Sequence, residues 1–158
     1  MMLLYKNGRF HTGKASFALP DGFYLESDIE LTEGSALCAW DPERKYLFRW
    51  QHFRDGEGSA RELQKWFLPD SGLTPLSEVV PVSVRGLTGQ MVLYRSYRPR
   101  YCEVRLDLGA GEELSLMVET RQGRAEEIPA SPAFRAAWEG LGPGECPERE
   151  EDGFGPKN

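Results

Sequence analysis

The sequence is poor in the residues that bind metals or form disulfide frameworks. It has only two histidines, His11 and His52, and neither has another histidine or a cysteine at the spacing of metal ligands. A disulfide scaffold would show a dense and even set of cysteines, whereas this chain has three scattered ones, Cys38, Cys102 and Cys146. We therefore expect no bound metal, and reduced thiols in the cytoplasm.

The motifs of common enzyme and cofactor-binding classes are missing as well. No Gly-x-Ser-x-Gly elbow of a serine hydrolase is present, and the Gly-Glu-Gly-Ser run that ends at Ser59 is explained by a helix N-cap. The pair Gly109 and Gly111 has neither the lysine of a phosphate-binding loop nor the strand-to-helix context of a dinucleotide site. These absences predict a protein without a cofactor and without enzymatic activity.

The charge balance and the N-terminus disfavour two further classes of partner. The chain of 158 residues carries a formal net charge of −6, so on average it repels the phosphate backbone of nucleic acids. Its apolar start is interrupted at Lys6. A signal peptide needs roughly 7–15 apolar residues and a membrane span about 20. We expect a protein that contacts neither nucleic acid nor membrane.

Patterns typical of β-strands cover most of the chain. Asn7-Gly8 favours a tight hairpin turn, and Pro20-Asp21-Gly22 favours a second turn between short strands. Apolar residues alternate with polar ones in the longer segments, as they do in half-buried strands. The predicted strands are residues 3–5, 9–12, 25–31, 35–40, 45–52, 77–85, 88–97, 101–108 and 114–120.

The alternation predicts an antiparallel sheet with one covered face and one wetter face. Between 101 and 108 the apolar side chains from Cys102 onward alternate with Glu103, Arg105 and Asp107. Between residues 45 and 52 every second residue is an aromatic residue or a histidine, and these side chains should face the core. They belong to Tyr46, Phe48, Trp50 and His52.

Two segments favour amphipathic helices. Ser59 opens a capping box with the glutamate three residues later, and this helix should end at Phe67, before a proline. Ser131 is a good N-cap for a second helix that starts with Pro132. The second helix has an apolar stripe made of Phe134, Ala137, Trp138 and Leu141. Such faces, which include the indoles of Trp66 and Trp138, are suited to cover a sheet.

Together these elements predict an α+β fold in which short helices cover a curved antiparallel sheet. We expect one domain over residues 1–141, with an N-terminal hairpin at 1–14 and a core at 15–141. Residues 142–158 are rich in proline, glycine and acidic residues. Such a segment buries too little apolar area to offset its ordering entropy, so we expect a disordered acidic tail.

Several stretches carry a resemblance to a known fold family. They are Phe17-Ala-Leu-Pro-Asp-Gly-Phe, the helix at 59–67, Val82-Ser-Val-Arg-Gly-Leu-Thr-Gly and the helix at 132–141. The order of these stretches resembles the family of the photosystem II subunit PsbP, the Ran-binding factor Mog and the bacterial DcrB-like proteins. The resemblance implies an α/β/α sandwich without shared catalytic residues. Its members mostly bind proteins, and one bacterial branch looks like chaperones of type VI secretion effectors.

One stretch concentrates residue types that are common in binding patches. Five arginines lie between 85 and 105 against a single acid, Glu103, which makes a local charge of +4. Tyr94, Tyr97 and Tyr101 are interleaved with them. The guanidinium of arginine can donate two hydrogen bonds to one carboxylate, and the ring of tyrosine offers a rigid contact area. The candidate partner-binding residues at the hairpin tip are Arg95, Tyr97, Arg98, Arg100 and Tyr101. The competing interpretation is an ordinary solvated face.

The leading hypothesis is a non-enzymatic adaptor module that contacts a protein partner through a sheet face or through this hairpin. A second hypothesis is a protein similar to the type VI effector chaperones. A third is an enzyme or small-ligand binder whose groups converge only in three dimensions, with His52, Tyr46 and Trp40 lining its pocket.

Overall fold

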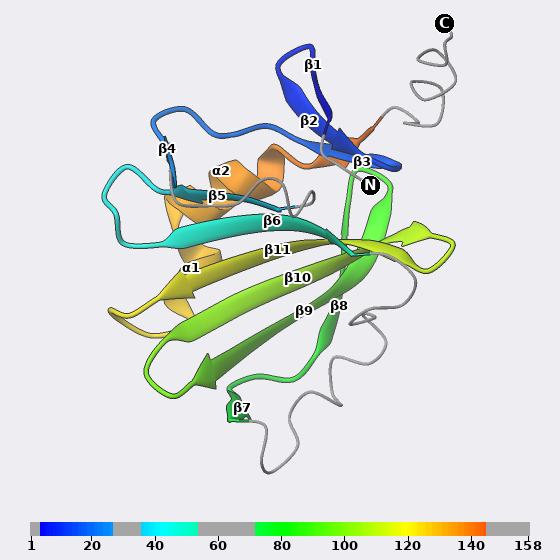
Figure 1. Ribbon diagram of the computed structural model, residues 1–158. Helices are drawn as coiled ribbons and strands as arrows, with labels where there is room; N and C mark the ends of the chain where they lie inside the picture. The colour runs from blue at the N-terminus through cyan, green and yellow to red at the C-terminus, as the bar shows by residue number, and fades with distance from the viewer. Residues whose placement is uncertain (1–3, 27–35, 54–71, 145–158) are drawn as a thin grey trace, which may run out of the picture.

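The computed structural model describes residues 4–26, 36–53 and 72–144, and antiparallel strands dominate them (Figure 1). Strands account for 55% of this part and helices for 11%. The helices are short, α1 (Glu127–Ala130) and α2 (Pro132–Glu139). The predicted α+β class, and the α/β/α sandwich implied by the resemblance, are therefore wrong, because the fold is closer to all-β. The helix expected at 59–67, with Trp66, lies outside the described residues.

The large sheet contains eight strands, all paired antiparallel. Its order is β4-β5-β6-β11-β10-β9-β7, and β8 also pairs with β9. The bounds are β4 (Tyr24–Leu25), β5 (Ala36–Trp40), β6 (Leu47–Phe53), β7 (Leu73–Pro75), β8 (Val80–Val84), β9 (Leu87–Ser96), β10 (Arg100–Gly109) and β11 (Glu112–Thr120). The four strands from β8 to β11 confirm the corresponding predictions, with boundary shifts of a few residues.

A second sheet has the order β1-β2-β3-β12. Its strands are β1 (Leu4–Lys6), β2 (Arg9–Thr12), β3 (Ala15–Phe17) and β12 (Gly142–Pro143). Asn7 and Gly8 have φ angles of 57° and 78°, which confirms the predicted hairpin turn. β12 corrects the predicted tail boundary, since its two residues pair with β3. Residues 145–158 lie outside the described part of the chain.

The small sheet and the helices pack on one face of the large sheet. Phe17 of β3 stacks on Trp50 of β6 with ring centroids 5.0 Å apart and planes 3° apart. Phe134 of α2 belongs to the same core cluster. Both helices lie behind the large sheet in Figure 1. A strand of the small sheet thus occupies a place on the core face that the sequence assigned to a helix, which explains the error in fold class.

The core face agrees with the predicted alternation. Tyr46, Phe48, Trp50 and His52 are all buried, as expected. α2 also forms as predicted, with the Ser131 hydroxyl accepting a hydrogen bond of 3.1 Å from the Phe134 backbone N–H. Trp138 is only partly buried against this core. The predicted pattern of inward residues is therefore correct, although part of the covering layer is a sheet.

Candidate functional site

The candidate hairpin is formed by β9 and β10 at one end of the large sheet. Arg95 pairs with Arg100 and Tyr94 with Tyr101 across the strands. The turn closes with a hydrogen bond of 3.0 Å from the Ser96 N–H to the Pro99 carbonyl. The five candidate residues therefore lie at or beside one tip, as predicted from the sequence.

Tyr97 is the most prominent side chain of this tip. Tyr97 is 81% exposed, and its φ of 59° lies in the left-handed region that residues with a Cβ rarely occupy. Its phenol lies over Gly72, where an added methyl group would come within 3.1 Å of the Tyr97 hydroxyl. The fold thus holds a large aromatic ring in water on a strained turn.

Three arginines of the same tip have no carboxylate partner among the described residues. Arg95 and Arg98 are exposed and Arg100 is half-buried. Across the described ranges no carboxylate lies within ion-pair distance of any of the three, and the Arg100 guanidinium only donates a long hydrogen bond of 3.5 Å to the Arg98 carbonyl. We call Arg95, Arg98 and Arg100 the hairpin arginines. They place three positive charges at the tip that carries Tyr97. A backbone hydrogen bond is the main cause that lowers the pKa of the Glu126 carboxyl, and the charge of Arg100 contributes to this shift.

Tyr101 lies on the other face of the sheet from Arg100. It is half-buried and stacks on Tyr94 with ring centroids 5.0 Å apart. Burial and the Glu119 carboxylate raise the pKa of the Tyr101 phenol. Tyr101 therefore supports the base of the hairpin from the face opposite the paired Arg95 and Arg100.

The other two arginines of the predicted patch lie elsewhere. Arg85 is in the turn between β8 and β9, at the opposite end of β9, and donates a hydrogen bond of 3.1 Å to the Leu141 carbonyl. Arg105 is buried in the middle of β10. The exposed patch is therefore smaller than the sequence interval indicated, because one run of sequence covers both ends of a long hairpin.

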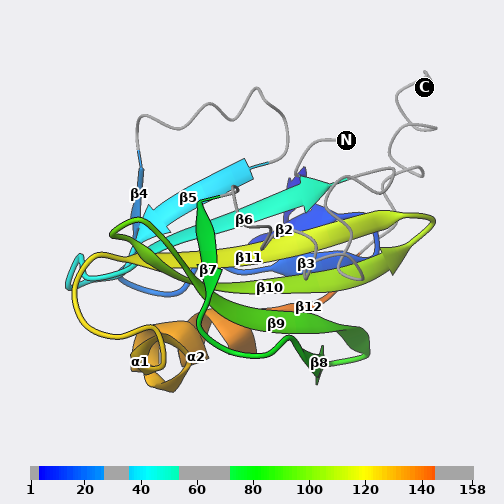
Figure 2. The same ribbon diagram turned by 90° about the horizontal axis from the view of Figure 1, so that it is seen from below.

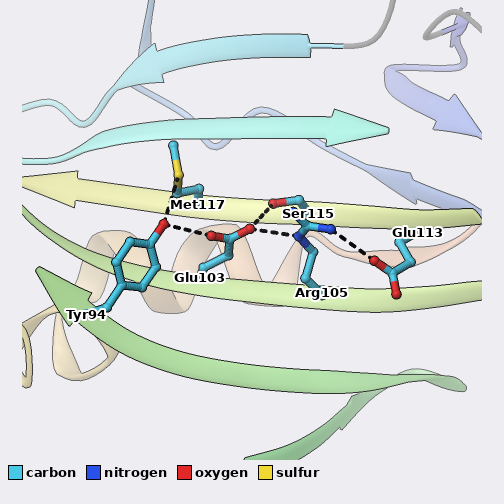
Figure 3. A network of polar contacts seen from close by, with 6 residues as sticks. All are labelled: Tyr94, Glu103, Arg105, Glu113, Ser115 and Met117. Carbon is cyan, nitrogen blue, oxygen red and sulfur yellow. Dashed lines mark hydrogen bonds and ion pairs between the residues drawn. The ribbon is translucent and has the colours of Figure 1, made fainter. Parts of the chain in front are cut away.

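Arg105 belongs to a buried polar network that the sequence analysis missed (Figure 3). The carboxylate of Glu103 accepts hydrogen bonds from Tyr94 Oη at 2.8 Å, Arg105 Nε at 2.7 Å and Ser115 Oγ at 3.2 Å. Arg105 Nη1 also donates to Glu113 Oε1 at 3.0 Å. The face predicted to be wetter thus carries buried charges, two carboxylates and a guanidinium, in its middle.

Internal contacts hold the members of this network together. Burial and the adjacent Glu103 carboxylate raise the pKa of the Tyr94 phenol, so this hydroxyl remains a donor. The Arg105 guanidinium also lies 4.1 Å from the centroid of the Phe53 ring. Glu103 and Arg105 are two residues apart on one face of β10, which is the pattern that could have indicated this pair.

The three residues of the hypothetical pocket do not come together. His52 is buried and its Nε2 lies 3.0 Å from Glu112 Oε1. Tyr46 shares the face of His52, but six residues of extended chain separate them by about 20 Å. Trp40 lies on the opposite face, where its indole donates to Glu26 at 3.0 Å.

Described residues line two clefts beside α2. One, about 250 Å³, lies between the helices and the strands β8 and β9, and we call it the α2 cleft. The other, about 260 Å³, lies between α2 and the turn that follows β5. Acidic side chains, Asp21, Asp41 and Glu43, line the second cleft, whereas Arg135 is the charged residue of the first.

Comparisons with known proteins add no family to these observations. No protein-family model matches the chain, and no curated protein matches it either. The resemblance to the PsbP, Mog and DcrB-like proteins therefore stays a prediction. Within the described ranges, no three histidine, cysteine or acidic side chains are grouped so that they could hold a metal ion. Nor does that part contain a helix of the length and apolarity needed to cross a membrane.

Proposed function

We propose that the protein is a non-enzymatic, cytoplasmic binding module that holds an acidic segment of a partner protein on the β9–β10 hairpin. The observation that carries this proposal is the group of three hairpin arginines, which form no ion pair with a described carboxylate, at the tip that carries the exposed Tyr97. Each guanidinium can donate two parallel hydrogen bonds to a carboxylate. A tyrosine beside them adds rigid contact area of the kind found in binding hot spots.

Other basic side chains at the same end of the sheet differ from the hairpin arginines, because they form ion pairs. At the same end of the sheet Arg121 pairs with Glu119 at 3.4 Å, Arg124 with Glu126 at 3.4 Å and Lys45 with Glu127 at 4.0 Å. These cations are already neutralised by their neighbours. Among the described residues the hairpin arginines form no such ion pair, although Arg100 acts at longer range on Glu126 and the chain carries a net charge of −6. Their field is therefore local and attracts an anionic segment to one place.

Recognition through side chains also agrees with the sheet edges. A partner strand adds to a sheet by hydrogen bonding to an open edge. The edge strands β1 and β4 are only three and two residues long, and β7, β8 and β12 contain Pro75, Pro81 and Pro143. Proline removes a backbone donor and is a known protection of edge strands. These edges are therefore poor templates, and we expect the partner to contact side chains.

A direct test measures binding of a fluorescein-labelled hexaglutamate peptide by anisotropy. We expect weak binding that decreases when the salt concentration rises from about 50 to about 500 mM, because exposed charges are screened. Replacing Arg95, Arg98 and Arg100 with glutamate should weaken it about tenfold or more. This estimate takes about 0.5 kcal/mol for each exposed contact.

The matched control reverses Lys45, Arg121 and Arg124 to glutamate, which changes the net charge by the same amount at the same end of the sheet. It should bind much more tightly than the hairpin variant. Equal losses in the two variants would show that only the net charge matters. Equal affinity for a single-stranded oligonucleotide of the same charge would contradict recognition of a protein segment.

A further inference from the structure

We infer that the α2 cleft takes one bulky apolar side chain of the same acidic segment, so that the partner is recognised by an apolar anchor and by carboxylates together. This inference rests on the proposed function and specifies the chemistry of the partner. Its basis is an apolar cleft with a positive rim, on the face of the sheet that also carries two hairpin arginines.

The walls of the α2 cleft are apolar and come from both layers of the fold. Phe134 and Trp138 of α2 stack with ring centroids 5.9 Å apart, and Val82 and Met91 face them from β8 and β9. Pro129 of α1 closes one side. The volume of the α2 cleft, about 250 Å³, is below the roughly 300–1,000 Å³ of cofactor and drug sites. The space suits a single aromatic or branched aliphatic side chain.

The rim of the cleft determines which charge is favoured in the partner residues next to the apolar anchor. Arg135 lines the cleft and is exposed, and no described residue forms an ion pair with it. An acidic group next to the apolar anchor would be attracted to this guanidinium, whereas a basic group would be repelled. The second cleft has the opposite charge and would reject the same segment.

The cleft and the hairpin arginines lie on the same face of the large sheet. Successive side chains of a strand alternate between faces, so Met91, Leu93 and Arg95 of β9 point to the same side. Arg100 is directly opposite Arg95 and shares that side. Figure 2 shows both helices on one side of β9 and β10, near the hairpin end. Leu93, between Met91 and Arg95, is buried in the same core cluster as Ile128 of α1, so the arginines lie beyond this covered stretch. A segment that reaches both would have to pass over α1.

The spacing defines the motif that the partner must carry. Met91 and Arg95 are four residues apart, which corresponds to about 13 Å along a strand. An extended peptide has nearly the same rise per residue. A large apolar residue would enter the cleft, and acidic residues at least four positions away would reach Arg95 and Arg100.

The test uses three synthetic peptides of about ten residues and an NMR titration of the full chain. The first peptide carries a tryptophan four positions from a glutamate pair; in the second a serine replaces the tryptophan; in the third glutamines replace the glutamates. We expect the first to shift the indole signal of Trp138, and to bind at least fivefold more tightly than either of the others.

Substitutions that fill the cleft test whether an apolar side chain of the peptide enters it. Val82→Phe should reduce affinity for the first peptide about fivefold and leave affinity for the second unchanged. Ser83→Phe, on the exposed opposite side of β8, is the control and should bind both as the wild type does. Arg135→Glu should also weaken binding of the first peptide. Because it leaves the apolar walls intact, this variant tests the inference even if Val82→Phe disturbs folding.

The outcomes separate the two proposals. The hairpin variant is the one in which glutamate replaces Arg95, Arg98 and Arg100. If the first two peptides bind the wild type equally and this variant binds neither, the hairpin proposal stands and the cleft inference is overturned. If the first peptide binds equally well to the hairpin variant but not to Val82→Phe, the proposed function is overturned. Failure of every peptide to bind would overturn both.

Discussion

Arg105 and Glu103 form a buried ion pair on β10, with Nε and Oε2 2.7 Å apart and side chains only 3% and 4% exposed. They are neighbours on one face of the same strand, and Glu113 of β11 holds the other side of the guanidinium at 3.0 Å. Because both charges are removed from water, each depends on its partner. The contact between Arg105 and Glu113 therefore joins β10 to β11 in one register, and the whole network leaves little tolerance for substitution.

Arg105→Met keeps much of the side-chain volume but leaves the Glu103 and Glu113 carboxylates without their cation. We expect this variant to lose about 3–5 kcal/mol of unfolding free energy, measured by urea denaturation. The control is Arg121→Met, since Arg121 pairs with Glu119 while being 73% exposed. It should lose less than about 1 kcal/mol. Equally small losses in both variants would contradict a buried pair.

The strands and turns could be predicted because their determinants are local. Alternation of apolar residues along β6, β10 and β11 specifies which side chains face the core, whatever covers them. Asn7-Gly8 suits positive φ angles at two successive positions, and these residues adopt them. The Ser131 cap and the stripe of α2 are equally local. These features need no knowledge of distant contacts.

The fold class and the extent of the patch could not be predicted because they depend on long-range contacts. Whether a helix or the strand of Phe17 covers Trp50 is decided by packing across the core, and both are apolar in sequence. The alternation near Glu103 and Arg105 indicates a solvated face, although these charges are buried. Only the register of β10 with β11 brings Glu113 to the guanidinium and removes Arg105 from the patch.

Tyr94 predicts a loss of stability in alkaline solution. Its pKa is raised above the ordinary 10.0 by burial and by Glu103, so the native state keeps the phenol proton that the unfolded chain releases. This contribution is complete below pH 10 and is lost as the pH rises above it, by up to about 1.4 kcal/mol per pH unit. It should be absent in Tyr94→Phe.

The measurement is urea unfolding of wild type and Tyr94→Phe at about pH 8 and pH 11. At pH 8 the variant should be less stable by about 1 kcal/mol, because it lacks the hydrogen bond to Glu103. At pH 11 the difference should shrink or change sign. A difference that stays constant across this range would show that the Tyr94 phenol titrates alike in both states.

Gly89 tests how closely β9 and β10 approach. A Cβ at this position would collide with the Arg105 carbonyl group. Gly89→Ala should therefore force a backbone shift and cost about 2 kcal/mol or more of unfolding free energy. Thr88→Ala, at the exposed neighbouring position, should cost less than about 1 kcal/mol. Comparable melting temperatures for the two variants would mean that the strands adjust without strain.

Tyr97 offers a test in which stability and binding should change in opposite directions. The left-handed φ of 59° costs a residue with a Cβ on the order of 1 kcal/mol, which glycine avoids. Tyr97→Gly should therefore raise the melting temperature by a few degrees. The same variant should bind the hexaglutamate peptide and the tryptophan-containing peptide several-fold more weakly, because the exposed ring is removed. Strain that is retained at the cost of stability is typical of functional positions.

Ala110 provides the matched control for this prediction. It also has a positive φ, 55°, and lies in the exposed turn between β10 and β11, at the other end of the sheet. Ala110→Gly should raise the melting temperature to a similar extent and leave peptide binding unchanged. If Tyr97→Gly binds both peptides as the wild type does, then Tyr97 has no part in recognition. The hairpin arginines would have to account for the binding alone.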